Sequence, residues 1–282
     1  MKGIEVEIKN AKLNKLKTIL KSLDSLLIAY SGGVDSTFLL KVAHDVLGDC
    51  MLAVTVKSET YTQSECDEAI KFARQHHINH MVISTNELEY PHFKSNPINR
   101  CYYCKNELFS KLKQLAKENN IEHVVDGTNF DDIDDFRPGL KAIKELDIRS
   151  PLKEAGLTKK EIRLLSHQMG LPTWNKPALA CLASRFPYGI TITPQKLNRV
   201  EQAETFLHKL GFKQVRVRHH DHIARIEVSQ EDIGRVSSLD YRDKIIKKLK
   251  ELNYQYITLD LQGFRSGSMN EVLSLTNKTR NL

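Results

Sequence analysis

Residues 26–47 read LLIAYSGGVDSTFLLKVAHDVL. The apolar run Leu26–Tyr30 predicts a buried strand, and Thr37–Leu47 has the apolar spacing of a helix. Two glycines stand between these elements, where they let the backbone turn tightly and bring its N–H groups close to a ligand. The unpaired N–H groups at the start of the helix favour an anion. The stretch therefore predicts a phosphate-binding loop between a strand and a helix.

The loop itself is the hexapeptide Ser31-Gly32-Gly33-Val34-Asp35-Ser36. The two serines add hydroxyl donors for phosphate, and the Asp35 carboxylate can help to hold Mg²⁺. A plain glycine turn with a Ser or Asp cap is the alternative, but the complete strand–loop–helix context argues against it. The sequence has neither the G-x-x-x-x-G-K-[ST] of Walker-type NTPases nor the G-x-G-x-x-G of dinucleotide-binding folds.

Apolar runs and helical stretches alternate around this loop. Further strands are predicted at Met51–Val56, Met81–Ser84 and Val124–Asp126, and helices at 11–23, Glu65–His76, Lys105–Glu118 and Thr158–Met169. The last helix begins with a Thr158–Glu161 capping box. This alternation predicts an α/β fold, in which helices cover a parallel sheet.

Two further side chains are candidate contacts for a nucleotide. Asp126 ends a predicted strand, and ligands of open α/β sheets bind at the carboxyl ends of the strands. Arg137 lies in the Asp-rich loop that follows. Each has a plainer interpretation: Asp126 only terminates the strand, and Arg137 only pairs with Asp134 or Asp135.

The sequence changes character after Gly189. Residues 171–188 contain three prolines and little periodicity, which is typical of a loop or linker. Beyond them a helix is predicted at Gln195–Leu210, and strands at Gln214–Arg218, Ile223–Val228 and Tyr256–Leu261. We therefore expect two domains, 1–189 and 190–282, the second being a smaller α+β domain.

Composition narrows the class of protein. The 282 residues carry a net charge of +7, and residues 191–282 hold 16 basic against 11 acidic side chains, or +5. An anionic partner, nucleic acid or a phosphorylated small molecule, is compatible with this excess, and so is a merely soluble basic surface. No apolar run reaches the roughly 18 residues of a membrane span, and the N-terminus lacks the apolar stretch of a secretory signal. We expect a cytoplasmic protein.

Three of the five cysteines are candidates for metal binding or catalysis. Cys101 and Cys104 form Cys-Tyr-Tyr-Cys just before the helix expected from Lys105, and Cys181 lies in the irregular segment. A helix N-terminus favours thiolates. Three thiolates can hold a [4Fe–4S] cluster with one iron open to an exogenous ligand such as sulfide. A zinc site completed by a His, or a redox dithiol, remains open; Cys50 and Cys66 are interpreted as incidental.

Several arginines could bind a phosphate group. Arg216 and Arg218 alternate on one predicted strand and so face the same side, and Arg265 lies near two glycines. Glu204 on the preceding helix could orient one of them. Arg185 follows Cys181 closely enough to stabilise a thiolate or an anionic intermediate. Guanidinium groups bind phosphate bidentately, although a solvated basic strand is the alternative.

The loop resembles the PP-loop of the N-type ATP pyrophosphatases. Together with the cysteines, Trp174-Asn175-Lys176-Pro177 and Ser184-Arg185-Phe186-Pro187-Tyr188-Gly189, it makes the chain similar, almost end to end, to LarE. This family of ATP-dependent sulfur transferases matures the nickel-pincer nucleotide cofactor of lactate racemase. The presence of Cys101 and Cys104 departs from its single-cysteine members, which sacrifice one cysteine sulfur, and favours the three-cysteine branch with a [4Fe–4S] sulfur carrier.

The resemblance implies a PP-loop ATP pyrophosphatase domain, of the adenine nucleotide alpha-hydrolase type. ATP, with Mg²⁺ on Asp35, would be held by the loop, Asp126 and Arg137. A carboxylate of a pyridinium dicarboxylate mononucleotide would be adenylated, with release of pyrophosphate, and sulfur would then displace AMP. Arg216, Arg218 and Arg265, with Glu204 and Arg185, would hold the substrate phosphate. The family also suggests a homo-oligomer.

Four other functions compete with this one. A tRNA thiolase would share the adenylation and the three cysteines, but the sequence shows no zinc ribbon and no aromatic-interleaved basic stretch for RNA. An amide-forming synthetase leaves the three cysteines unexplained. Sacrificial transfer from Cys181 would make the protein a single-turnover reagent. A nucleotide-binding sensor without catalytic activity would need neither the Asp35 carboxylate in the loop nor the three cysteines 101, 104 and 181.

Overall fold

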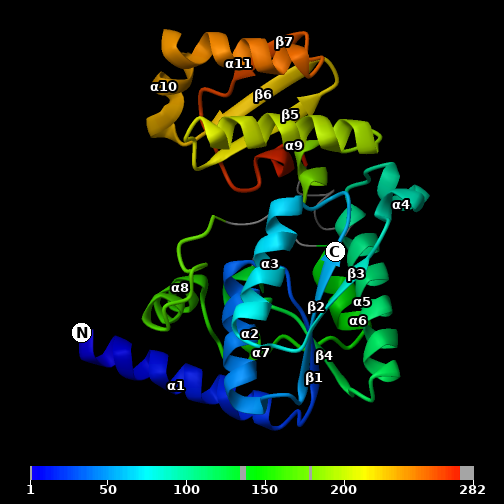
Figure 1. Cartoon of the computed structure of the whole chain (residues 1–282), viewed down its shortest axis with the longest axis vertical. Helices are drawn as coiled ribbons and strands as arrows, with labels where there is room; N and C mark the ends of the chain where they lie inside the picture. The colour runs from blue at the N-terminus through cyan, green and yellow to red at the C-terminus, as the bar shows by residue number, and fades with distance from the viewer. Residues whose placement is uncertain (1, 134–137, 178–179, 274–282) are drawn as a thin grey trace. The chain divides into compact units, whose positions relative to one another are not determined.

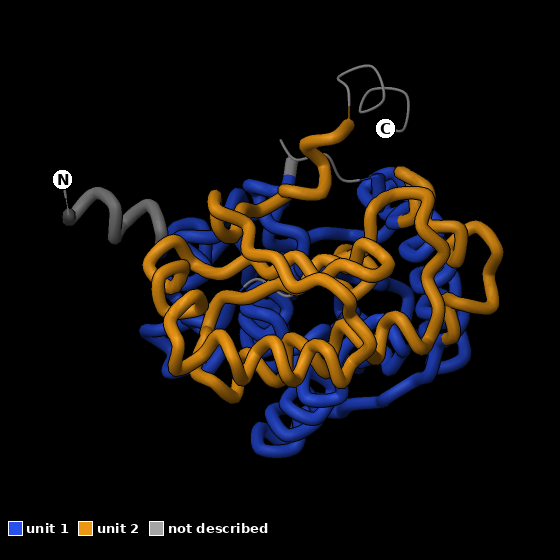
Figure 2. Tube along the Cα trace, turned by 90° about the horizontal axis from the view of Figure 1, so that it is seen from above, with its two compact units in different colours: residues 1–85, 101–179, 282 blue, residues 86–100, 180–281 orange. Residues whose placement is uncertain are grey.

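The computed structural model describes residues 2–133, 138–177 and 180–273. These residues form two compact units, coloured separately in Figure 2. The first contains residues 2–85 and 101–177, and the second contains 86–100 and 180–273. The second unit thus takes in two stretches, 86–100 and 180–189, that the expected boundary at 189 placed in the first domain. The reason is pairing within it: the carbonyl of Asn96 accepts from Gly189 N, and that of Lys94 from Ile192 N, both at 2.9 Å.

A four-stranded parallel sheet in the order β3-β2-β1-β4 forms the centre of the first unit (Figure 1). Its strands are β1 (Leu26–Ala29), β2 (Met51–Lys57), β3 (His80–Ser84) and β4 (His123–Val125). Leu26 of β1 aligns with Met51 of β2 on one side and with His123 of β4 on the other. The predicted α/β class and parallel sheet are confirmed.

Helices cover both faces of this sheet. Alternate residues of β1 point to opposite faces, so Ile28 and Leu27 lie in different apolar cores. The core around Ile28 is formed with α1 (Lys2–Lys21), α2 (Val34–Leu47), α3 (Gln63–Gln75), α7 (Pro151–Glu154) and α8 (Lys159–Gln168). The core around Leu27 is formed with α5 (Arg100–Glu118) and α6 (Gly139–Glu145). The capping box predicted at the start of α8 is present.

The second unit contains a three-stranded sheet in the order β5-β6-β7. Its strands are β5 (Val215–His220) and β6 (Ile223–Val228), which pair antiparallel, and β7 (Tyr256–Leu259), which pairs parallel to β6. One face packs on α9 (Pro194–Lys209) and α11 (Leu239–Glu251) through an apolar core, and the other face is polar. The remaining elements of the chain are short: α4 (Pro91–Lys94), α10 (Ile233–Ser237), and the single turns Glu87–Glu89, Phe130–Ile133, Leu182–Arg185, Gln230–Asp232 and Ser268–Asn270.

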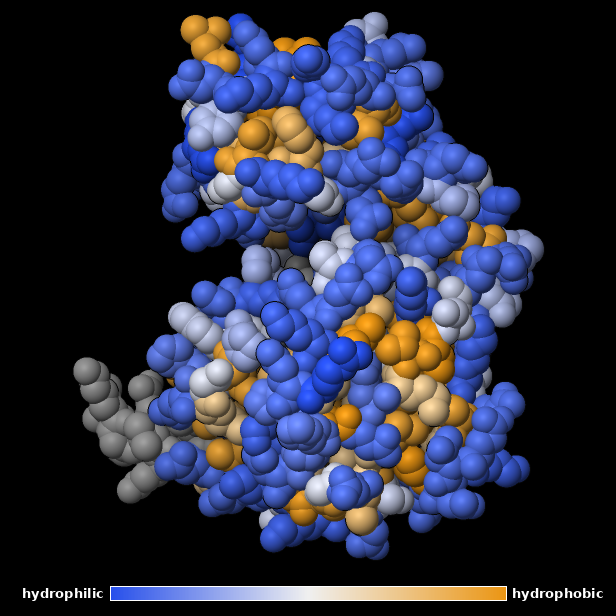
Figure 3. All heavy atoms as spheres, viewed as in Figure 1, coloured by the Kyte–Doolittle hydropathy of each residue, from blue (hydrophilic) through white to orange (hydrophobic). Residues whose placement is uncertain are grey.

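Polar residues dominate the face of the molecule that Figure 3 shows, with smaller apolar groups between them. Among the helices that the structure describes, none has both the length and the apolar character needed to cross a bilayer.

Candidate active site

The loop after β1 is organised by its own hydroxyl groups. Ser31 Oγ and Ser36 Oγ are 3.0 Å apart, and Ser36 Oγ lies 3.3 Å from the carbonyl of Gly33. Gly32 has a φ of +70°, and a Cβ there would come 3.1 Å from the Cβ of Ala69 on α3. A side chain at position 32 would therefore be strained and would collide with α3. α2 begins at Val34, inside the hexapeptide, so its first N–H groups belong to the loop.

Asp35 lies on the first turn of α2 and forms an ion pair with Lys159, the first residue of α8. Its Oδ1 is buried and has no hydrogen-bond partner among the residues that the structure describes. Burial raises the pKa of this carboxyl group, and the charge of Lys159 opposes the rise. A buried carboxylate oxygen without a donor, on a loop that also carries two serine hydroxyls, is a suitable ligand for Mg²⁺, which prefers hard oxygen ligands. The donor set therefore fits the expected cation.

Asp126 holds the neighbouring turn together. The carboxylate is buried and accepts from Thr128 Oγ1 at 2.5 Å and from Ser150 Oγ at 2.7 Å. The next residue, Gly127, packs directly on the loop, because a Cβ there would come 3.1 Å from Ser36 N. Asp126 is thus placed to position the loop. Arg137, the other expected ATP contact, lies outside the described residues.

A lysine that sequence reasoning did not single out also reaches the loop. Lys176 Nζ lies 3.3 Å from the carbonyl of Gly32 and 2.6 Å from Glu68 Oε2 on α3. Lys159 was missed in the same way. The sequence held a signal for Lys159, because the capping box at Thr158 places residue 159 on the first turn of a helix; Lys176 stood only within a family-like string.

Cys101 and Cys104 are the second and fifth residues of α5, because this helix begins at Arg100 and not near Lys105 as expected. Three residues apart on a helix, they lie on one face. Cys101 is exposed and Cys104 half-buried. The start of α6 packs on the start of α5, since a Cβ on Gly139 would come 3.3 Å from the carbonyl oxygen of Cys101.

Cys181 belongs to the second unit, where it is half-buried and precedes the turn Leu182–Arg185. Within the described residues of either unit, no three His, Cys, Asp or Glu side chains are grouped to hold a metal ion. Thiols are donors that iron–sulfur clusters and zinc sites both use, so the residue type is compatible with the expected cluster. Of the other two cysteines, Cys66 is buried, which raises the pKa of its thiol, and Cys50 is exposed, as Cys101 is.

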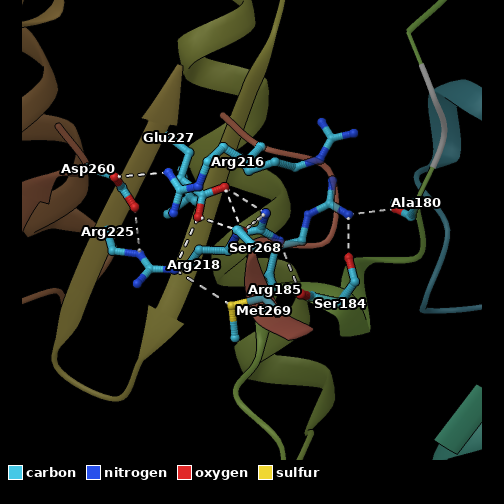
Figure 4. Close-up of polar contacts among 12 residues, drawn as sticks. Ala180, Ser184, Arg185, Arg216, Arg218, Arg225, Glu227, Asp260, Ser268 and Met269 are labelled. Atoms are coloured by element: carbon cyan, nitrogen blue, oxygen red, sulfur yellow. Dashed lines mark hydrogen bonds and ion pairs between the residues drawn. The ribbon is translucent and has the colours of Figure 1, made fainter. Parts of the chain in front are cut away.

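The polar face of the second sheet carries a buried network of charges, drawn in Figure 4. Arg218 Nη2 donates to Glu227 Oε2 at 2.6 Å and to Ser268 Oγ at 3.0 Å. Glu227 is fully buried and is also paired with Arg225, the cross-strand neighbour of Arg218. Arg218 Nε is buried and lacks a hydrogen-bond partner within the described part of the chain. This face is therefore rich in guanidinium groups but partly neutralised by a carboxylate that the sequence analysis did not identify.

The other predicted phosphate ligands have different surroundings. Glu204 binds Arg185 through both carboxylate oxygens, at 2.9 and 2.8 Å, and accepts from Val217 N; it thus orients Arg185. Burial opposes the charge of Glu204, but Arg185 outweighs it, so the pKa of this carboxyl lies below its usual value. Arg216 lies over the ring of Phe264, with 5.5 Å from its guanidinium carbon to the centroid. Arg265 pairs with Asp260 and Glu271 at 3.4 and 3.0 Å.

A buried histidine on β5 should make the stability of the second unit depend on pH. His219 is fully buried, and its Nδ1 lies 3.1 Å from the hydroxyl of Tyr254. Burial, with smaller effects of Lys196 and Arg199, lowers its pKa from 6.5 to about 4. In the folded protein it stays neutral, whereas the unfolded chain takes up the proton, so stability is lost as pH falls through this window. The shift corresponds to about 3 kcal/mol.

Urea unfolding of the whole chain between about pH 7 and about pH 4 measures this loss directly. His219→Gln should flatten the dependence on pH, whatever its effect at neutral pH. His222→Gln, at an exposed position on the turn of the same hairpin, is the matched control and should leave the dependence unchanged. A slope that His219→Gln does not alter would contradict the assignment.

No family model matches the chain. It is 42% identical, over 92% of its length and 94% of the relative, to the pyridinium-3,5-bisthiocarboxylic acid mononucleotide synthase of Lactiplantibacillus plantarum. An uncharacterized protein of Synechocystis is 45% identical over 94% of this chain and 98% of its own length. One of the subunits of the glutamine-hydrolyzing GMP synthase of Archaeoglobus fulgidus is 27% identical over 63% of this chain and 62% of its own.

Proposed function

The chain belongs to the family of the pyridinium-3,5-bisthiocarboxylic acid mononucleotide synthases, and from this we propose that it is an ATP-dependent sulfur transferase. Its substrate would be a pyridinium dicarboxylate mononucleotide, whose carboxylate becomes a thiocarboxylate on the way to the nickel-pincer nucleotide. The name of the L. plantarum relative gives its product, a pyridinium bisthiocarboxylic acid mononucleotide, and from this product we infer the substrate class. The proposal of ATP-dependent sulfur transfer is supported by the phosphate loop with Asp35 and by the three cysteines of this chain.

One observation carries the proposal. The SGGVDS loop joins β1 to α2 with the helix starting inside it, and it presents a buried Asp35 oxygen that no described residue satisfies. Helix N–H groups and hydroxyls suit the phosphates of ATP, and the carboxylate suits Mg²⁺. The chain is also similar to a GMP synthase subunit. GMP synthases belong to the N-type ATP pyrophosphatases, whose PP-loop the SGGVDS loop resembles. This similarity supports ATP as the nucleotide.

The reaction balances in two displacements. A substrate carboxylate oxygen attacks the α-phosphorus of ATP, and pyrophosphate leaves with the electron pair of the broken bond. Sulfide then attacks the carboxyl carbon, and AMP leaves with the former carboxylate oxygen. Adenylation is needed because an unactivated oxygen is a poor leaving group, whereas AMP is a good one. The loop and Asp35 serve the first displacement.

We assign the second displacement to the cysteines. Cys101, Cys104 and Cys181 would hold a [4Fe–4S] cluster, and the cluster would supply the sulfide for this displacement. Two of these cysteines lie three residues apart at the start of α5. The family resemblance also leads us to propose a homo-oligomer, and the reduced thiols a cytoplasmic protein.

We propose that the phosphate group of the substrate binds at the polar face of the β5-β6-β7 sheet. Arg185 and Arg218 are both almost fully buried and are balanced by Glu204 and Glu227, so they fix the shape of the face. Arg216 is half-buried on the same face of β5 as Arg218. A dianion bound there would gain charge-assisted hydrogen bonds from guanidinium groups that are already ordered.

Arg216→Ala should therefore weaken binding of the mononucleotide by about 2 kcal/mol, or roughly 30-fold, for the loss of one charge-assisted contact. Binding of ATP should hardly change. Calorimetric titration of both ligands measures the difference, with Arg242→Ala on α11, a half-exposed arginine beside Asp243, as the control. Equal loss of ATP and substrate affinity would assign Arg216 to folding instead. Arg218→Ala is less informative, because it leaves Glu227 buried without this partner.

The proposed function is tested by measuring pyrophosphate release from Mg·ATP with different acceptors. We expect release only with the pyridinium dicarboxylate mononucleotide. Stimulation by unmodified tRNA instead would identify a thiolase of RNA. Release that needs ammonia would identify an amide-forming synthetase. Binding of ATP without release under any of these conditions would identify a sensor.

A further inference from the structure

The ammonium group of Lys176 is held against the phosphate loop. Its Nζ lies 3.3 Å from the carbonyl of Gly32, the loop residue with positive φ, and 2.6 Å from Glu68 Oε2. The side chain of Lys176 is only 17% exposed, whereas that of Glu68 is 62% exposed. The ammonium group of Lys176 is thus largely shielded from water. The carboxylate of Glu68 is solvated and can adopt another rotamer.

The backbone around Lys176 is fixed from α8. Arg163 donates from Nη1 to the carbonyl of Trp174 at 2.7 Å and from Nη2 to the carbonyl of Lys176 at 2.8 Å. The Trp174 ring meets the ring of His167 edge to face, at 4.5 Å between centroids. A surface ion pair with Glu68 contributes little and does not require so rigid a support. These contacts of Arg163 and Trp174 have a function if the ammonium group of Lys176 must keep a fixed position relative to the phosphate loop.

The ion pairs at the loop indicate that the ammonium group of Lys176 is available to bind a phosphate oxygen. The other lysine at the site, Lys159, is committed to Asp35 on α2. Lys176 is engaged by an exposed carboxylate, and exchanging that contact for a phosphate oxygen costs little, because exposed pairs are weak. A phosphate oxygen at the loop would instead lie at a helix N-terminus, where charge-assisted hydrogen bonds are strong.

We propose that Lys176 is a catalytic residue on the pyrophosphate side of the ATP site, and that Glu68 holds it there until ATP binds. When the substrate oxygen attacks the α-phosphorus, the bond to the bridging oxygen breaks and that oxygen takes the electron pair. The ammonium group of Lys176 donates hydrogen bonds to the departing pyrophosphate as this charge develops, and it transfers no proton. The inference rests on the proposed ATP chemistry of the same loop.

The test compares Lys176→Met with Lys176→Arg and with the control Lys160→Met, which removes an exposed lysine on α8. Lys176→Met should lower kcat for substrate-dependent pyrophosphate release by about 100-fold, the usual effect of losing one donor to a developing charge. It should also weaken binding of Mg·pyrophosphate at least about 10-fold, while binding of AMP is unchanged. Lys176→Arg should recover part of both effects, and Lys160→Met should behave as the wild type.

Binding of Mg·pyrophosphate keeps the inference separate from the proposed function, because it requires no turnover. If the wild-type chain binds pyrophosphate but no acceptor is adenylated, the proposed function fails and Lys176 is still tested by its effect on this affinity. Wild-type affinity and kcat in Lys176→Met would overturn the inference. A parallel loss of AMP binding and of thermal stability in both Lys176→Met and Lys176→Arg would also overturn it, since that is the signature of a structural role.

Discussion

Asp35→Ala should reduce pyrophosphate release from ATP to the background of the protein-free reaction, a loss of at least about 100-fold. The variant removes the buried carboxylate oxygen that we propose binds Mg²⁺ at the loop. The first unit should remain folded and become no less stable, because burial raises the pKa of Asp35 and so shows that the fold disfavours its charge. Lys159, whose side chain is 32% exposed, can turn to water when its partner is removed.

Pyrophosphate release and the thermal unfolding midpoint should be measured on the same preparation. Asp45→Ala is the matched control, since Asp45 lies on the same helix, pairs with Lys41 and is 43% exposed. It should change neither quantity. A well-folded Asp35→Ala protein that still releases pyrophosphate would remove Asp35 from the site, and with it the argument for Mg²⁺ at this position.

The second large effect concerns the cysteines. Replacing any one of Cys101, Cys104 and Cys181 by Ala should abolish both iron binding and sulfur transfer, because each is a proposed ligand of one cluster. Adenylation should survive in all three variants, since the loop and Asp35 are left intact. Iron in anaerobic preparations measures cluster binding, the thiocarboxylate product measures sulfur transfer, and pyrophosphate release measures adenylation. Cys50→Ala, at an exposed position in the first unit, is the control and should retain all of them.

Two other mechanisms predict different results for the same variants. Sacrificial transfer makes Cys181 alone essential, allows one turnover for each chain and leaves dehydroalanine at that position. A structural zinc site gives zinc in the elemental analysis and loss of folding on chelation. Turnover of supplied sulfide by a chain of unchanged mass is the result that agrees with the cluster.

The phosphate loop and the sheet around it could be predicted from sequence because their signals are local. An apolar run followed by SGGVDS and a helical pattern determines β1, the turn and α2 almost without reference to the rest of the chain. The capping box at Thr158 is equally local, since the two residues that form it are three positions apart. The α/β class followed from repeating such units.

What could not be predicted depends on contacts between distant residues. α5 begins before the expected Lys105 because Arg100 is buried and donates to the carbonyl of Ala183 at 3.0 Å, 83 positions away in the sequence. Asp35 and Lys159 are 124 positions apart, and Gly32 and Lys176 are 144. The pairing of Glu204 with Arg185, and of Glu227 with Arg218, likewise emerges only once α9, β5 and β6 are assembled.

Mass spectrometry of the product tests most directly whether the chain uses ATP to replace a carboxylate oxygen by sulfur. The chain, reconstituted with iron and sulfide without air, is incubated with Mg·ATP, supplied sulfide and the pyridinium dicarboxylate mononucleotide. We expect a product in which one carboxylate oxygen is replaced by sulfur, with one AMP and one pyrophosphate formed for each sulfur transferred. A mononucleotide that returns unchanged while ATP is cleaved, or that gains nitrogen in place of sulfur, would contradict the account.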